Sequence, residues 1–187
     1  MKTLFIDTHL FDINIYLVKD DKILRDKHIS GEKNNSKYLV STIKEVCEGE
    51  SYDQIVVVNG PGSFTGVRLG VTVAKTLAYT KKIPIKVVSS LECMCFSKDS
   101  CNHIYAISDG NGYFIGEFNN YHLIKEYYYV TNSEFKELIQ IKKIETEVEL
   151  NICFILDKLK LRKGINPHKV NPIYIKLIGV ENDKKNK

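Results

Sequence analysis

Apolar positions recur with two different periods along this chain, and the change of period marks the predicted elements. Near the N-terminus three short β-prone segments are separated by tight turns, which predicts a three-stranded meander: TLFIDT, INIYLVKDD and KILRDKHIS. The next segment, NNSKYLVSTIKEVCEG, repeats its apolar residues at helical spacing, with Asn35 or Ser36 as its cap and Gly49 at its end. The run QIVVVN is short and continuously apolar, which is typical of a strand covered on both faces.

The rest of the chain contains further helices and strands, among them a second meander with weak similarity to the first. A helical pattern over Phe64–Thr80 is followed by a buried strand, IPIKVVS, and a short helix, SLECMCFS. After Ser100 come a second meander and a helix, then an ambiguous segment and a last extended piece: HIYAISDG, GYFIGEFNN, LIKEYYYVT, NSEFKELIQI, VELNICFILDKLKL and NPIYIK. Meanders, helices and buried strands in this order predict an α/β fold with a mixed sheet.

The length and composition suit one globular unit built from two small lobes. With 187 residues, of which 43% are hydrophobic, the chain can form a real core. We divide it into a first lobe at 1–100, a second, shortened lobe at 101–178 and a basic, disordered tail at 179–187. No apolar run approaches the roughly 18 residues of a membrane helix. Asp7 and Asp12 interrupt the stretch where a signal peptide would be apolar, so we expect a cytoplasmic protein.

Basic residues concentrate near the C-terminus. Nine Lys or Arg and two Asp or Glu lie between Lys158 and Lys187, whereas the remaining chain carries 18 basic and 21 acidic residues. Such a tail either contacts RNA or is a solvated end.

The cysteines and histidines predict no metal site. The five cysteines form no CxxC motif, and the spacing of Cys93, Cys95 and Cys101 fits no common zinc pattern. The five histidines form neither HxxxH nor HExxH. We therefore expect reduced thiols that are buried or incidental.

The stretch NGPGSFTGVRLGVTVAKTLA joins a buried strand to a helix through a turn rich in Gly and Pro. Backbone N–H groups at such a helix start can hold an anion. The lysine of a GxxxxGK[ST] loop is absent, however, and glycines at 60, 62 and 66 do not match GxGxxG. The turn is therefore either an anion site or a sharp reversal of the chain. The candidate nucleotide- or anion-binding residues are Asp7, Gly60, Gly62, Ser63, Arg68 and Asp109.

The helix after this turn has an unusually wide apolar face. At 100° per residue, Thr65, Thr72, Lys75, Thr76 and Tyr79 lie within about 80° of Arg68, and apolar residues fill roughly 200° of the remaining circumference. A helix on a sheet needs a stripe of only about 100°. Gly66 and Gly70 lie in the middle of the apolar arc, where they would let another helix come close. Either the helix is buried within one domain, or a partner covers the excess. The candidate partner interface is Phe64, Gly66, Val67, Gly70, Val73, Ala74 and Leu77.

Two acidic residues end corresponding strands of the two meanders. Asp7 and Asp109 could face one cleft and hold a metal–phosphate group. They could equally form turns by accepting bonds from their own backbone. No residue pattern specifies a nucleophile and its base, so we predict no catalytic residue.

These motifs resemble those of the TsaB (YeaZ) family, from Met1 to about Phe118. The specific part is NGPGSFTGVRLGVTVAKTLA, supported by LFIDTH, YAISDGNGYFIGEF and NPIYIK. The resemblance implies an actin-like (ASKHA, ribonuclease H-like) fold, in which two related lobes each begin with a meander. The region between Asn120 and Pro172 is short for the family, which implies a reduced second lobe.

The resemblance also implies a function for the chain, and it implies no enzyme activity of its own. Family members act with TsaD, the catalytic subunit, and TsaE, an ATPase. The complex transfers a threonylcarbamoyl group to N6 of adenosine 37 in tRNAs that read ANN codons. The same helical surface serves a homodimer and TsaD, and tRNA is contacted through the complex. No cofactor of its own is implied, whereas ATP or ADP with Mg²⁺ belongs to the complex.

Two alternatives stay open at this point. One is an actin-like ATPase or phosphotransferase that places Mg-ATP between Asp7, Asp109 and the Gly60–Ser63 turn, although the missing lysine and base weigh against it. The other is a direct tRNA binder that uses the basic tail.

Overall fold

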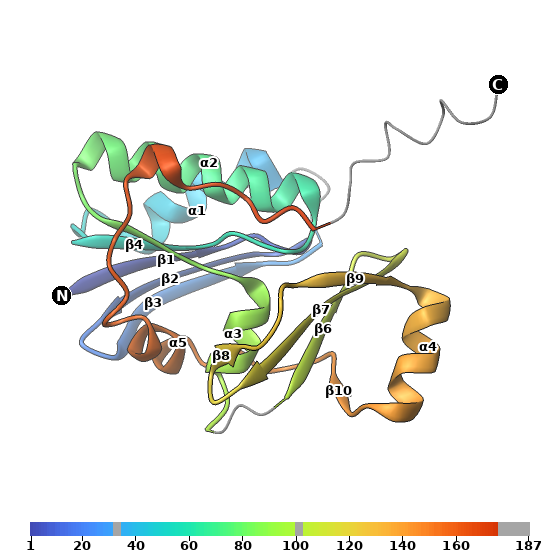
Figure 1. Cartoon of the computed structure of the whole chain (residues 1–187). Coiled ribbons are helices and arrows are strands. Elements are labelled where there is room, and N and C mark those ends of the chain that lie inside the picture. Colours follow the sequence, from blue (N-terminus) through green and yellow to red (C-terminus); the bar gives the residue numbers. More distant parts are fainter. Residues whose placement is uncertain (32–34, 100–102, 176–187) are drawn as a thin grey trace.

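The computed structural model describes residues 1–31, 35–99 and 103–175. The first sheet has the order β3-β2-β1-β4-β5 (Figure 1). The predicted meander is confirmed, because β1 pairs with β2 and β2 with β3, all antiparallel, while β4 and β5 run parallel to β1. The bounds are β1 Lys2–Asp7, β2 Ile13–Lys19, β3 Lys22–Ile29, β4 Gln54–Val58 and β5 Ile85–Val88.

Three helices belong to this half: α1 (Asn35–Cys47), α2 (Phe64–Lys81) and α3 (Ser90–Phe96). The N-cap of α2 is Ser63, whose side chain accepts a hydrogen bond from the Gly66 amide. Its C-cap is Lys82, whose backbone has a left-handed conformation. α3 begins with a capping box between Ser89 and Glu92. In Figure 1, α1 and α2 cover one face of the first sheet, and α3 lies toward the second sheet.

The second sheet has the order β10-β6-β7-β8, with β9 also paired to β7. β7 runs antiparallel to β6, β8 and β9, while β10 runs parallel to β6. The third strand of this meander is therefore split between β8 and β9. The bounds are β6 Ile104–Ser108, β7 Gly112–Asn119, β8 His122–Leu123, β9 Tyr128–Thr131, α4 Asn132–Ile141 and β10 Ile144–Glu145. The order β9-β7-β6-β10 repeats β3-β2-β1-β4, which accounts for the similarity seen in the sequence.

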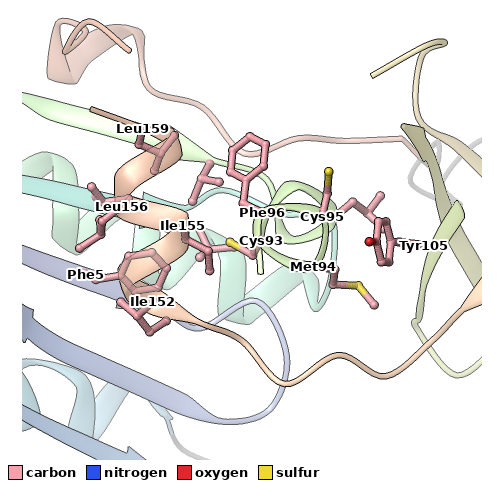
Figure 2. Packing of buried hydrophobic residues seen from close by; sticks show 14 of the residues in the cluster. Phe5, Cys93, Met94, Cys95, Phe96, Tyr105, Ile152, Ile155, Leu156 and Leu159 are labelled. Atoms are coloured by element: carbon pink, nitrogen blue, oxygen red, sulfur yellow. The ribbon is translucent and has the colours of Figure 1, made fainter. Parts of the chain in front are cut away.

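The core is arranged in layers. One cluster packs α1 and α2 onto the first sheet. A second lies between the sheets, where Phe5 meets Cys93 of α3 and Ile155 of α5 (Ile152–Lys158), as Figure 2 shows. A third, much smaller cluster joins the second sheet to α4. The expected α/β class is confirmed, since the chain forms two mixed sheets, whereas the reduced second lobe stays a prediction.

The last described residues return to the first half of the chain. The ambiguous VELNICFILDKLKL contains α5, and a 3-10 turn, η1 (Pro167–Lys169), follows. Between α5 and η1, Ile165 bridges to Ile85 on the edge of β5. After η1, the Ile173 amide donates to the Asn59 carbonyl. Figure 1 shows this segment running along α2. The lobe boundaries at 1–100 and 101–178 remain a proposal.

Some predictions fall outside the described residues, namely those for the tail at 179–187, for Cys101 and for the cap provided by the Asn35 side chain. The expectation of reduced thiols is wrong for Cys95, which is disulfide-bonded, whereas Cys47, Cys93 and Cys153 are free. Within the described ranges, no helix is both long and apolar enough to cross a membrane. The same residues contain no cluster of three His, Cys, Asp or Glu side chains able to hold a metal ion.

Candidate functional site

The wide apolar arc of α2 is covered largely by its own chain. Gly66, Val67, Gly70, Val71, Ala74 and Ala78 are buried on the first sheet. Leu69, Val73 and Leu77 lie on successive turns of α2 and are half-buried. They pack against the cluster that joins α1 and α2 to the first sheet. On the other flank Lys75 donates to the Val170 carbonyl, and Tyr79 packs against His168 at a ring-centroid distance of 5.0 Å. The first sheet and α1 therefore cover much of the arc that suggested a partner, while the segment around η1 contacts the polar stripe.

The interpretation of Gly66 and Gly70 as a seat for another helix is wrong. A Cβ atom at Gly66 would lie 2.2 Å from the Thr8 carbonyl oxygen, and one at Gly70 would lie 2.3 Å from Thr8 Oγ1. Thr8 Oγ1 also donates to the Gly66 carbonyl at 2.7 Å. The close neighbour is thus the turn between β1 and β2. Gly66, Val67, Gly70 and Ala74 are buried, so they cannot contact a partner directly in this structure.

An apolar groove remains open between α1 and α2. It encloses about 420 Å³ and is lined by residues of both helices and of the loop after α1. Val40 on its edge is 48% exposed, while Val73 and Leu77 form its α2 wall. Phe64, at the start of α2, is 47% exposed. Of the candidate interface residues, Phe64, Val73 and Leu77 are therefore the ones that a partner can reach.

The Gly-rich turn faces a cleft between the two sheets. The cleft encloses about 470 Å³, and Gly62, Ser63 and Asp109 all line it. Asp7 lines a neighbouring cavity of about 610 Å³. Gly60 and Arg68 line neither space. The structure therefore brings together three of the six candidate anion-binding residues.

Arg68 and the two glycines of the turn contact other residues of their own chain. Arg68 is exposed, with its guanidinium 4.9 Å from the centre of the Phe64 ring. Gly60 has a φ of 95° and packs on Val67 and on the Ile173 carbonyl. Gly62 lies so close to the His9 carbonyl that a Cβ atom would be 2.1 Å from its oxygen. These contacts favour the interpretation of the turn as a sharp reversal of the chain.

The two strand-end carboxylates have different surroundings. Asp7 is 1% exposed, and its Oδ1 accepts from the His9 amide and contacts His9 Nδ1 at 2.6 Å. Burial raises the pKa of the Asp7 carboxyl, but the charge and hydrogen bonds of His9 outweigh burial and leave the pKa lowered. Asp109 accepts from the Asn111 and Gly112 amides and from the Tyr129 hydroxyl. Both carboxylates therefore act as acceptors for groups of their own chain.

Sequence reasoning missed four residues that the structure places at open surfaces. Phe11 and Tyr174 line the 470 Å³ cleft and are 74% and 55% exposed. Val40 lines the helical groove, and His9 lines the 610 Å³ cavity. The position of His9 two residues after Asp7 was the one available signal, since an Asx turn at a strand end brings such a pair together.

Comparison with known proteins gives one family. The family described as TsaD: tRNA N6-adenosine threonylcarbamoyltransferase matches residues 32–135. Over 99 residues the chain is 40% identical to the tRNA threonylcarbamoyladenosine biosynthesis protein TsaB of Bacillus subtilis (strain 168), covering 50% of this chain and 43% of that protein. The protein of the same name from Haemophilus influenzae is 26% identical over 124 residues, covering 62% of this chain and 50% of its own length. The matches span about half the length of these curated relatives.

Two solved structures share the fold. YeaZ from Pseudomonas aeruginosa has a TM-score of 0.73 and 15% identity, covering 92% of this chain and 100% of its own. A protein with similarity to peptidase YEAZ from the same organism has a TM-score of 0.74 and 14% identity, covering 94% and 99%. At such identity the likeness concerns the fold alone.

Proposed function

This chain belongs to the TsaB (YeaZ) family, and we propose that it is a subunit of a threonylcarbamoyl-transfer complex. It acts in the cytoplasm beside a TsaD-like catalytic subunit and a TsaE-like ATPase, and it has no catalytic activity of its own. The complex modifies N6 of adenosine 37 in tRNAs that read ANN codons, and tRNA reaches this chain through the complex. ATP or ADP and Mg²⁺ act at the level of the complex. The chain also forms a homodimer through the surface that it offers to the catalytic subunit.

The observation that carries the proposal is the groove between α1 and α2. A pair of helices with an apolar groove between them accepts a helix of a partner by packing ridges into grooves. Val40, Val73 and Leu77 supply the apolar contacts, and Lys44 and Lys81 line the same groove. An exposed apolar surface of this kind is typical of an interaction site.

The proposed absence of catalytic activity rests on how the acidic residues are used. A general base must reach the substrate, and a metal–phosphate group needs carboxylate oxygens that face it. Asp7 is buried against His9, and Asp109 is bonded to the amides of its own turn. Each carboxylate thus has a structural use that explains its place at a strand end.

A binding experiment with two matched variants tests the docking surface. Val40→Asp and Ile139→Asp introduce the same charge at apolar positions that are 48% and 45% exposed, on α1 and on α4. We expect Val40→Asp to weaken retention of the cognate catalytic subunit at least about ten-fold, since a charge would be buried at the interface. Ile139→Asp should bind like the wild type. Equal retention of all three proteins would contradict the proposed surface.

The second candidate function is an actin-like ATPase or phosphotransferase. The observation that favours it is the 470 Å³ cleft, which is lined both by Ser63 at the start of α2 and by Asp109. Calorimetry of the isolated chain with Mg-ATP separates the two functions. Tight binding, with turnover that is lost in Asp7→Asn, would favour the enzyme, whereas the subunit proposal predicts no turnover by the chain alone.

A further inference from the structure

The two helices that form the open groove carry almost only positive charge. α2 has no acidic residue over its 18 residues, and α1 has one. The charged residues of both helices are five cations and one acid, in chain order Lys37, Lys44, Glu45, Arg68, Lys75 and Lys81. Since Lys44 and Lys81 also line the groove, the electrostatic potential at this surface is positive.

The acidic residues nearest to the groove are already paired. Glu45 of α1 forms an ion pair with Lys27 of β3. Glu50, which lines the groove from the loop after α1, pairs with Lys2 of β1. Both carboxylates are thus neutralised by cations of the first sheet, and neither compensates the charge of the lysines in the groove.

The two lysines of the groove have no acidic partner of their own. Within residues 1–31, 35–99 and 103–175, no carboxylate forms an ion pair with Lys44 or Lys81. Lys81 Nζ instead lies 5.0 Å from the centre of the Tyr52 ring, and Lys44 is exposed. Both lysines line the same groove as Val73 and Leu77, so a partner that covers these apolar side chains also meets two ammonium groups. A carboxylate on that partner would form charge-assisted hydrogen bonds there.

A second copy of this chain matches the charge of this surface poorly. A two-fold contact places the same patch of both copies against each other, so cations of one copy face cations of the other. Like charges that face each other across an interface oppose association. The repulsion does not depend on how the copies cross, because Lys37 and Arg68 lie near the starts of the two helices, and Lys44 and Lys81 lie near their ends.

We propose that the groove binds a helical surface with carboxylates beside an apolar stripe, and that Lys44 and Lys81 make this partner bind in preference to a second copy of the chain. The inference rests on the proposed function, because it names the chemistry of the surface that the catalytic subunit presents. The apolar stripe of the partner packs on Val73 and Leu77, and its carboxylates accept hydrogen bonds from the two lysines. The homodimer uses the same surface and is the weaker association, and salt strengthens it by screening the repulsion.

The first measurement needs only the full wild-type chain and its cognate catalytic subunit. Sodium chloride is raised from about 50 to about 500 mM, which screens interactions between exposed charges. Calorimetry follows the complex with the catalytic subunit, and sedimentation equilibrium follows the homodimer. We expect the complex to weaken several-fold and the homodimer to strengthen several-fold over this range. Apolar contacts alone would not make the two associations respond to salt in opposite directions.

Two matched double variants assign the effect to the groove. Lys44→Gln with Lys81→Gln removes two charges from exposed positions of α1 and α2. Lys136→Gln with Lys143→Gln removes two charges from exposed positions of α4 and of the turn after it. We expect the groove variant to bind the catalytic subunit about ten-fold more weakly and to self-associate several-fold more strongly than the wild type. The α4 variant should match the wild type in both measurements.

The outcomes separate this inference from the proposed function. If the wild-type chain fails to bind the catalytic subunit at every salt concentration, both are contradicted. If the chain binds, but the complex does not weaken with salt or the groove variant binds like the wild type, the docking surface stands and this inference alone is overturned. A homodimer that weakens as the salt rises, or that is no stronger in the groove variant than in the α4 variant, overturns the inference as well.

Discussion

The two sheets of this protein share a strand order and differ greatly in what covers them. The order β3-β2-β1-β4 recurs as β9-β7-β6-β10. The outer face of the first sheet is covered by α1 and α2 over a cluster of 18 buried residues, whereas the second sheet and α4 bury three. The burial of apolar area is the main stabilising term. Apart from the cluster that the two sheets share, we therefore call the first sheet with α1 and α2 the robust half, and the second sheet with α4 the marginal half. The first half is the one that can present a rigid helical surface.

The two turns that end β1 and β6 show the same contrast. Asp7 is buried, and its neighbour Thr8 fills the space above Gly66 and Gly70. Asp109 forms an open Asx turn, and a Cβ atom at Gly110 would meet nothing within 4 Å. Corresponding positions thus tolerate different residues.

The largest expected effect comes from comparing these two turns by substitution. Gly66→Ala places a Cβ atom 2.2 Å from the Thr8 carbonyl oxygen, and we expect it to lower the free energy of unfolding by about 3 kcal/mol or more. Gly110→Ala, at a φ of 89° in open space, should cost only about 1 to 2 kcal/mol. Denaturant unfolding measures both, and equal costs would remove the distinction between the turns.

The independence of the second sheet can be tested in its small cluster. Phe135 stacks on Tyr113 at a centroid distance of 3.6 Å, and Phe135→Ala should remove about 3 kcal/mol of local stability. Amide hydrogen exchange should then accelerate in β6, β7 and β9 and stay unchanged in β1 and β4. Acceleration of similar size in both sheets would show that the two halves unfold together.

A buried carboxylate makes the second sheet sensitive to acid. Burial raises the pKa of Glu117, but hydrogen bonds from Lys125, Tyr128 and Lys142 outweigh burial and hold it at about 2, against an ordinary value of 4.5. A lowered pKa in the folded state stabilises the protein above pH 4.5, and this stabilisation is lost as the pH falls toward 2.

The matching variant is Glu117→Gln. Since both lysines are partly exposed, we expect it to cost on the order of 1 to 2 kcal/mol at neutral pH. The difference from the wild type should shrink as the pH is lowered from 5 toward about 2, where the native carboxylate protonates as well. A difference that does not change with pH would contradict the assignment of this ion cluster.

The smallest expected effect concerns the start of α4. Thr131 accepts from the Glu134 amide, and Glu134 in turn accepts from the Thr131 amide. Thr131→Ala should cost about 1 kcal/mol, measured by denaturant unfolding. Ser133→Ala removes a hydroxyl from the same turn without breaking the capping box, so it should cost less than half as much. The reverse ranking would contradict the role of the cap.

Local patterns were enough to predict most elements of the fold. Strand alternation and helical spacing placed both meanders, α1, α2 and α3, because each of these segments has one dominant period. The split of the third strand into β8 and β9 was not predictable, since LIKEYYYVT reads as one continuous strand. The return of the last residues to α2 depends on long-range contacts such as that of Ile173 with Asn59, which no local pattern encodes.

The candidate site was predictable only in part. The angular pattern of α2 correctly separated its exposed polar stripe from its buried face. It could not tell whether a partner or the same chain covers the apolar arc, because both leave the same sequence pattern. The sequence pattern could not predict the contact of Thr8 with Gly66 and Gly70, because this contact depends on the packing of the turn after β1. The open groove at Val40 likewise depends on how α1 lies beside α2.

The central claim, that the robust half presents the docking surface, can be tested by amide hydrogen exchange with and without the cognate TsaD-like subunit. We predict that binding slows exchange in α1 and α2 and leaves β9 and α4 unchanged. Protection confined to β9 and α4, with α1 and α2 exchanging as in the free chain, would contradict the account.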